Sequence, residues 1–234
     1  MSKILLVAGH GEGDPGAIGN GYKEADLTRE VVTKLYDKLK NIYNVTVYDT
    51  AKNLYKQRKN GLNFNFRQYD LVLEVHFNSG GGHGCEEEIH AKTEQKAVGK
   101  RILSNLSAVG FKNRGANRRT DLSNLNGAYK QGANYCYLET CFIDSASDMK
   151  LWANKKAEII SAIARGITGE TKEDKTMEKF NDVKDHWAEK QINEVAQMGI
   201  VNGRPGGKFC PNDNITRAEA AVMIRNVIRY LSGK

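Results

Sequence analysis

The sequence lacks any hydrophobic run long enough to cross a lipid bilayer. Its longest apolar stretches, such as Ile4 to Ala8, are far shorter than the roughly 20 residues that a membrane-spanning helix needs. The N-terminal segment MSKILLVAGHG also lacks the longer apolar region and the small-residue cleavage site of a secretory signal. We therefore expect no membrane span, and a chain made in the cytoplasm without a signal peptide.

Cysteines at spacings typical of metal sites are also missing. None of the four cysteines forms a Cys-x-x-Cys pair, and their spacing does not resemble a structural zinc site: Cys85, Cys136, Cys141 and Cys210. Free and mostly buried thiols are the expected state. Because Cys136 and Cys141 flank Glu139, a thiol nucleophile with His76 as its base is an alternative. Strand alternation points Cys136 away from Glu139, so core packing is the better interpretation of Cys136.

No nucleic-acid-binding signature accompanies the positive charge of the chain. The net charge of +7 favours anionic partners, and both nucleic acid and an anionic bacterial wall qualify. The basic residues are scattered, with one main cluster, KNRGANRR, from Lys112 to Arg119. Because zinc-finger, aromatic RNA-binding and basic-zipper patterns are all missing, we expect no nucleic acid partner.

The order of apolar segments predicts an α/β fold. Short apolar runs typical of buried strands occupy residues 3–8, 45–48, 70–76 and 135–139, and residues 85–90 form a further extended segment. Apolar residues at helical spacing predict helices at residues 24–39, 52–66, 92–109 and 145–167. This alternation is typical of a twisted, mainly parallel sheet that is flanked by helices.

A composition change marks a second part of the chain. Residues 169–178 are charged and almost free of apolar side chains, which is typical of a linker. Two amphipathic helices follow, near residues 186–198 and 217–231, around a turn-rich segment. They predict a small helical C-terminal module at residues 179–234. Thr216, with Glu219 three residues later, predicts a capping box at the start of the last helix.

Two histidines and two glutamates fall at the ends of these elements. His10 follows the first strand, Glu24 begins the first helix, and His76 and Glu139 end two later strands. Ligands usually bind at the edge where such strands end. Two imidazoles and one carboxylate can hold a catalytic zinc ion with one position left for water, and a second carboxylate can take that water's proton. Each residue also has a purely structural interpretation, as a turn cap or a first-turn helix charge.

Other histidines and glutamates compete for this assignment. His83 lies in the glycine-rich loop Gly80 to Gly84, which lacks the Gly-Lys-Ser/Thr ending of a phosphate loop. Glu86, Glu88 and His90 share one face of their extended segment and could bind a cation. A solvated sheet edge is the favoured interpretation of that face.

Several motifs together resemble the zinc-dependent N-acetylmuramoyl-L-alanine amidases of the amidase-3 type, from Lys3 to about Gly166. They stand in the family's order at suitable spacings: GHGEGDPGAIG (Gly9 to Gly19), HFN (His76 to Asn78), NRG (Asn113 to Gly115) and LETCFID (Leu138 to Asp144). The resemblance implies His10, Glu24 and His76 as zinc ligands, Glu139 as catalytic acid/base, and a six-stranded sheet in a catalytic domain at residues 1–168. Glu12 and Asp144 depart from the family's usual Gly and Asn, which affects loop shape and substrate contacts.

The C-terminal module resembles one S-layer homology repeat, from Phe180 to Ile228. The resemblance is carried by five segments: FNDV (180–183), HWA (186–188), GIVNG (199–203), FCP (209–211) and ITRAE (215–219). Gly206 departs from the usual Asp. The resemblance implies a groove for an anionic secondary cell-wall polymer, lined by Asp182, Trp187, Gly203 and Arg217. Alternatively, Trp187 and Arg217 only complete a small core.

Together the two resemblances imply a peptidoglycan hydrolase, either a phage-type endolysin or a host autolysin. It would cleave the amide between N-acetylmuramic acid and L-alanine at the bacterial cell wall, after release or holin-type export. A zinc carboxypeptidase or endopeptidase of the stem peptide and a non-catalytic wall-anchoring protein are the alternatives. Because such repeats usually share one core in threes, the single repeat predicts a homo-oligomer formed through the C-terminal module.

Overall fold

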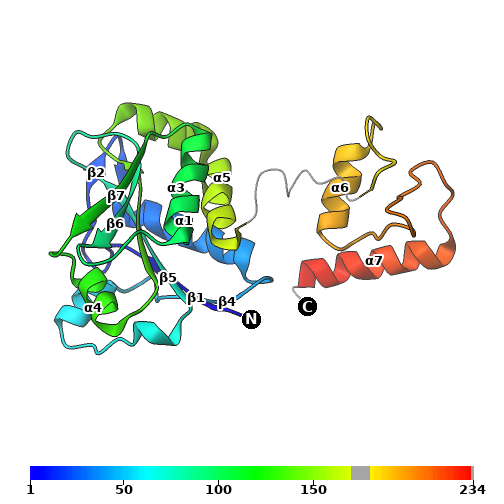
Figure 1. The fold of residues 1–234 in the computed structure, drawn as a ribbon. Coiled ribbons are helices and arrows are strands. Elements are labelled where there is room, and N and C mark those ends of the chain that lie inside the picture. Colours follow the sequence, from blue (N-terminus) through cyan, green and yellow to red (C-terminus); the bar gives the residue numbers. More distant parts are fainter. Residues whose placement is uncertain (170–179, 233–234) are drawn as a thin grey trace. The chain divides into compact units, whose positions relative to one another are not determined.

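The computed structural model describes residues 1–169 and 180–232. The chain divides into two compact units, Met1–Glu170 and Thr171–Lys234, and each is described here by itself (Figure 1). The predicted linker at residues 169–178 lies outside the described residues except for Gly169. None of the described helices combines the length and the apolar character that a membrane span requires.

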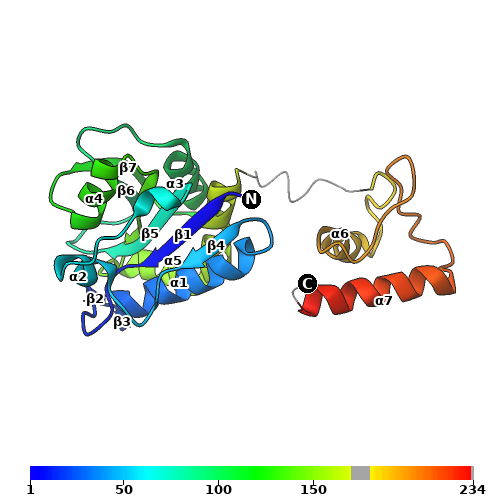
Figure 2. The same cartoon turned by 90° about the horizontal axis from the view of Figure 1, so that it is seen from below.

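A six-stranded sheet forms the centre of the first unit (Figures 1 and 2). Its order is β4-β1-β5-β8-β6-β7, in which the first four strands are parallel, β6 is antiparallel to β8, and β7 is parallel to β6. The strands are β1 (Lys3–Ala8), β4 (Asn44–Val47), β5 (Leu71–Asn78), β6 (Cys85–His90), β7 (Asn113–Arg119) and β8 (Tyr135–Phe142). The predicted mainly parallel sheet is confirmed. A separate two-stranded ribbon pairs β2 (Ile18–Gly19) with β3 (Tyr22–Lys23).

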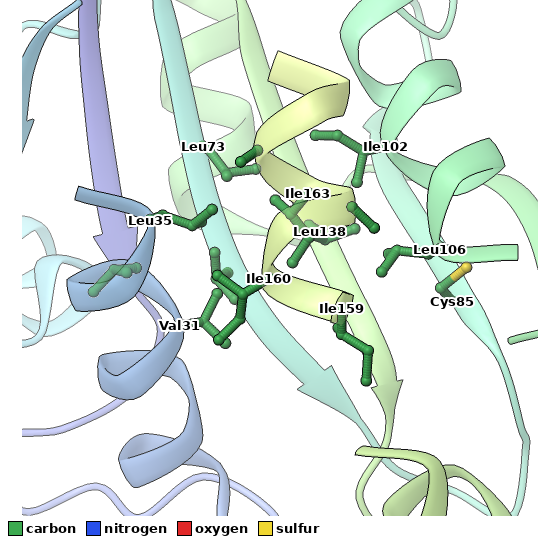
Figure 3. Packing of buried hydrophobic residues seen from close by; sticks show 14 of the residues in the cluster. Val31, Leu35, Leu73, Cys85, Ile102, Leu106, Leu138, Ile159, Ile160 and Ile163 are labelled. Carbon is green, nitrogen blue, oxygen red and sulfur yellow. The ribbon is translucent and has the colours of Figure 1, made fainter. Parts of the chain in front are cut away.

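Three long helices cover one face of the sheet: α1 (Glu24–Leu39), α3 (Ala97–Val109) and α5 (Ala146–Thr168). Their apolar side chains meet Leu73 of β5 and Leu138 of β8 in one buried cluster (Figure 3). Each fully buried aliphatic side chain contributes about 1.5–3 kcal/mol, so this core fixes α1, and with it Glu24, against the sheet. Short helices cover the other face: α2 (Leu54–Lys59), the 3₁₀ turn Phe66–Gln68, and α4 (Ser123–Gln131).

The prediction of one helix over residues 52–66 is wrong. Helix α2 ends after Lys59, and Gly61 has a φ of +100°, which continues no right-handed helix. The basic cluster from Lys112 to Arg119 contains all of β7, and neither β7 nor α4 was predicted. The other predicted helices of this unit are confirmed, although α3 begins at Ala97 rather than Lys92.

The second unit contains α6 (Glu189–Gln197) and α7 (Arg217–Ser232). Its small core is formed by Phe180, Val183, Ile192, Ala196, Ile200 and Val201. The predicted capping box is confirmed, because the Glu219 amide donates to Thr216 Oγ1 and the Thr216 amide donates to Glu219 Oε2. On α7, Val222, Ile224 and Ile228 are exposed, so much of the helix's apolar surface is not covered within this unit.

Candidate metal centre

The fold brings His10, Glu24 and His76 together at one edge of the sheet. His10 lies two residues beyond β1, Glu24 is the first residue of α1, and His76 lies near the end of β5. Glu24 Oε2 is 3.1 Å from His10 Nε2, and Glu24 Oε1 is 2.9 Å from His76 Nδ1. One potential ligand atom from each residue lies within 4.8 Å of the others. Across residues 1–169 and 180–232, this is the one such cluster of three or more His, Cys, Asp or Glu side chains.

The loop after β1 holds His10 in a backbone conformation that is unusual for a residue with a side chain. His10 has a φ of +61°, a region that is unfavourable for a residue with a side chain by about 1–3 kcal/mol. The guanidinium of Arg29 on α1 stabilises it by donating to the carbonyls of Gly9 and His10, both at 2.8 Å. A Cβ at Gly9 would lie 2.2 Å from the His76 ring, so only glycine allows the two segments to approach this closely.

A carboxylate holds the second nitrogen of His10. Asp14 Oδ2 is 3.0 Å from His10 Nδ1, and Asp14 Oδ1 accepts a hydrogen bond from the Gly16 amide at 3.0 Å. The turn after Asp14 therefore folds the loop back over the site. This contact leaves His10 Nε2 facing Glu24.

The electrostatics of the cluster favour an ionised Glu24. Burial opposes its ionisation, but hydrogen bonds to His10 and His76 outweigh burial and hold the pKa of Glu24 well below its ordinary value. Burial likewise lowers the pKa of His76, whereas hydrogen bonds to Glu24 and Glu74 raise it, to about 10. The cluster thus pairs one carboxylate with imidazoles that hold their protons tightly when no metal is present.

This donor set fits a zinc ion. Imidazole nitrogen and carboxylate oxygen are both ligands of zinc, and catalytic sites use three protein ligands with the fourth position open. His10 offers Nε2, His76 offers Nδ1, and Glu24 offers an oxygen between them. Each of these two nitrogens must be unprotonated to bind a metal, so a zinc ion would displace any proton that they carry.

Glu139 lies beside this cluster on the neighbouring strand. It is directly opposite His76 in the parallel register of β5 and β8, so both side chains emerge on the same face. Its Oε2 atom is buried and has no hydrogen-bond partner among the described residues. Burial raises the pKa of Glu139 to about 8, while the charge of His76 lowers it. A carboxyl group with a raised pKa and an unused oxygen is suited to take up and release a proton.

A cleft opens beside the candidate ligands. It has a volume of about 260 Å³ and includes His10 and His76 in its wall. Residues from five segments complete the lining: Asp14, Asn53, Tyr55, Glu74, Asp121, Leu122, Ser123, Asn124 and Tyr137. A substrate could therefore reach the ligand cluster from this side.

A protein-family model described as N-acetylmuramoyl-L-alanine amidase matches residues 4–169. The chain belongs to the N-acetylmuramoyl-L-alanine amidase family. It is 32% identical over 186 residues to a probable autolysin PH of Staphylococcus aureus, covering 70% of this chain and 37% of that protein. It is also 32% identical over 178 residues to an endolysin of Bacillus phage SPP1, covering 71% of this chain and 64% of the endolysin. The chain thus spans less than two thirds of the length of either relative.

The fold of the amidase-family unit is also found in solved structures. The catalytic domain of the CD27L endolysin targeting Clostridia difficile matches with a TM-score of 0.60 and 22% identity, covering 73% of this chain and 99% of that domain. In the second unit, a model of the S-layer homology domain matches residues 179–221. Both resemblances inferred from sequence motifs are therefore confirmed at the level of family.

The competing ligands do not join the cluster. His83 is exposed in its loop, and Glu86, Glu88 and His90 are buried. Their interpretation as a solvated edge is wrong, because β7 pairs along β6 and extends the sheet beyond it. Arg114 Nε lies 2.6 Å from Glu86, and Arg119 lies 3.3 Å from Glu88. These ion pairs also use part of the positive charge of the 112–119 cluster. Cys136 is fully buried, as expected of a core residue.

Of the four residues expected to bind wall polymer, one lines the groove beside α7. Asp182 accepts hydrogen bonds from the amides of Phe209 and Cys210, both at 2.8 Å, while Trp187 is 87% exposed. A Cβ at Gly203 would lie 2.2 Å from the Phe180 ring, and Arg217 is exposed at the start of α7. A groove of about 500 Å³ runs beside α7 and includes Gly203, but not the other three.

Three residues near the metal cluster were not identified from the sequence: Asp14 as a partner of His10, Glu74 as a partner of His76, and Arg29 as the support of the loop. Glu74 could have been predicted from the sequence, because a residue two positions before His76 on a strand lies on the same face. Arg29 could not have been, because its acceptors are backbone carbonyls far along the chain.

Proposed function

We propose that this protein is a zinc-dependent N-acetylmuramoyl-L-alanine amidase that cleaves the amide between N-acetylmuramic acid and the L-alanine of the stem peptide in peptidoglycan. One observation carries the proposal: two imidazoles and a carboxylate lie within 4.8 Å of one another, with Glu139 opposite His76 on the next strand. Membership of the amidase family and the autolysin and endolysin relatives support the choice of substrate.

In this proposal, His10, Glu24 and His76 hold the zinc ion. Bound zinc would polarise the scissile carbonyl and lower the pKa of a water molecule. Glu139 accepts the proton of the attacking water through its unpartnered oxygen and returns it to the leaving amine of L-alanine. Burial, which raises the pKa of Glu139, helps this carboxyl to hold the proton between the two steps.

The second unit would bring the enzyme to the wall. We infer that the S-layer homology module binds an anionic secondary cell-wall polymer, supported by its family match and by the net charge of +7. Asp182, Trp187, Gly203 and Arg217 remain the candidate contacts; Trp187 and Arg217 are exposed and therefore accessible. We propose three parts with separate roles at the bacterial wall: catalysis by residues 1–168, a linker at residues 169–178, and wall binding by residues 179–234.

The decisive experiment analyses the products released from purified peptidoglycan together with the zinc content of the same sample. The amidase releases peptides with a free L-alanine amine, whereas a stem-peptide carboxypeptidase or endopeptidase leaves L-alanine attached to muramic acid. Chelation should abolish lysis, and added zinc should restore it.

Variants assign the metal to these residues. His10→Ala and His76→Ala should each lower bound zinc to well below one ion per chain, while His83→Ala, which alters an exposed histidine outside the cluster, should bind zinc normally. Full lysis by a metal-free sample, or normal zinc content in both ligand variants, would contradict the proposal.

A further inference from the structure

The ring of His76 is fixed on three sides. Its Nδ1 atom lies 2.9 Å from Glu24 Oε1, and its Nε2 atom lies 3.3 Å from Glu74 Oε1. The ring of Tyr137 on β8 stacks on it, with centroids 4.3 Å apart and planes inclined by 7°. Because opposite nitrogens face different carboxylates, the imidazole has one defined orientation, with Nδ1 toward the metal cluster.

Glu74 is itself held by donors from two other elements. It is buried, at 3% exposure, and lies two residues before His76 on β5, on the same face of the sheet. Asn124 of α4 donates its Nδ2 hydrogen to Glu74 Oε1 at 3.0 Å, and the hydroxyl of Tyr135 on β8 donates to Glu74 Oε2. Two donors besides His76 therefore fix the carboxylate in place.

We propose that Glu74 is a positioning residue of the zinc site: its carboxylate accepts the Nε2–H of His76 and so orients the ring with Nδ1 directed at the metal. This inference rests on the proposed zinc function. In metal sites, a ligating histidine is usually oriented by a hydrogen bond from its other nitrogen, which selects the tautomer and strengthens the ligand.

The contact of His10 with Asp14 has the same arrangement with the nitrogens exchanged. There Nδ1 meets Asp14 at 3.0 Å and Nε2 faces Glu24, whereas in His76 Nε2 meets Glu74 and Nδ1 faces Glu24. In both imidazoles, the nitrogen turned away from the cluster contacts a carboxylate. The Asp14 side chain is partly exposed in its loop, while Glu74 is buried within the sheet, so Glu74 is the support that is better shielded from water.

Two substitutions separate the charge of Glu74 from its ability to accept a hydrogen bond. Glu74→Gln retains an acceptor oxygen and removes the charge, so we expect about 10-fold weaker zinc binding; Glu74→Met removes the acceptor, and about 100-fold weaker binding is expected. Zinc affinity of the full chain is measured by competition with a chelator of known affinity. The graded order of wild type, Gln and Met is the signature of positioning.

Glu87→Gln is the matched control. Glu87 is also a buried carboxylate of the central sheet, but it contacts Gln95 rather than the metal cluster. This variant should bind zinc as tightly as wild type. Thermal melting of each variant with and without zinc gives the stabilisation that zinc adds, and a 10-fold loss of affinity reduces that stabilisation at a fixed excess of zinc by about 1.4 kcal/mol.

The outcomes separate this inference from the proposed function. If the wild type binds no zinc, the proposed function fails. If the wild type binds zinc and Glu74→Gln binds it equally well, the positioning role alone is overturned. An equal loss of affinity in Glu87→Gln would also overturn it. Should a Glu74 variant not fold, Tyr135→Phe removes one donor to Glu74 and decides: weaker zinc binding supports the role, and unchanged binding overturns it.

Discussion

Replacing Glu139 by glutamine tests the proposed acid/base without disturbing the metal ligands. The side chain keeps its shape but can no longer accept a proton. Turnover on purified peptidoglycan should fall by about 100-fold or more, the range that general acid–base catalysis contributes. Bound zinc should stay at the wild-type level, because Glu139 is not one of the three clustered residues. Near-normal turnover would show that Glu139 is not the base.

The same substitution should stabilise the metal-free protein near neutral pH. Burial raises the pKa of Glu139 from 4.5 to about 8, so between these values the folded state holds a proton that the unfolded state releases. Wild-type stability therefore loses a contribution as pH rises above 4.5. At pH 7 the loss in the free energy of unfolding is about 3 kcal/mol. Because Glu139 is partly exposed, screening by water reduces this loss to about 2 kcal/mol. Glutamine is neutral throughout, so the variant avoids this loss.

Urea unfolding of chelator-treated protein measures this effect. Buried Trp152 reports on the first unit, and a Trp187→Phe background removes the signal of the exposed second tryptophan. Glu139→Gln should be more stable than its parent by about 2 kcal/mol at pH 7 and equally stable at pH 4. Glu94→Gln, which changes a highly exposed carboxylate, should show no such pH-dependent gain. The absence of any gain at pH 7 would refute the desolvation of Glu139.

Three further predictions concern the metal and the second unit. Zinc binding should release protons, because the raised pKa of His76, about 10, keeps it protonated at pH 7; affinity should rise about tenfold per pH unit for each proton released. Calorimetry in two buffers measures this, and constant affinity from pH 7 to 9 would contradict it. A chain cut near Thr171 should hydrolyse soluble muramyl peptides normally but sediment less with intact walls; equal sedimentation would argue against an anchoring module. The full chain should self-associate through the exposed apolar residues of α7, and light scattering that finds only monomer at tens of micromolar would exclude this.

The main candidate residues could be predicted because their signals are local. An apolar run that ends at glycines places His10 at the end of β1, and helical spacing from Glu24 onward places that carboxylate at the start of α1. Strand assignments for residues 70–76 and 135–139 similarly put His76 and Glu139 at one edge. The parallel order that brings these ends together follows from the alternation of strands and helices.

Other features depend on contacts between distant segments. The segment NRGANRR has no alternating apolar residues, yet it forms β7 because it pairs with β6 and its arginines meet Glu86 and Glu88. Charged side chains are usually exposed, but Glu86 and Glu88 on β6 are buried because they pair with arginines 28 or more residues away in the sequence. Neither strand pairing nor these distant partners can be inferred from a local sequence pattern. The pattern therefore predicts a solvated edge at β6, where the structure has a buried strand.

Hydrogen bonding distinguishes the roles of two glutamates that share one face of the sheet. Glu74 accepts from Asn124, Tyr135 and His76, so its oxygens are fully engaged and it can orient a ligand without moving. Glu139 has a buried oxygen with no partner in the described residues. Glu87 and Glu88 on β6 also have a buried oxygen without a partner in the described part of the chain, but of these three glutamates only Glu139 lies directly opposite the candidate ligand His76. These contacts support the proposed roles, proton transfer by Glu139 and positioning by Glu74.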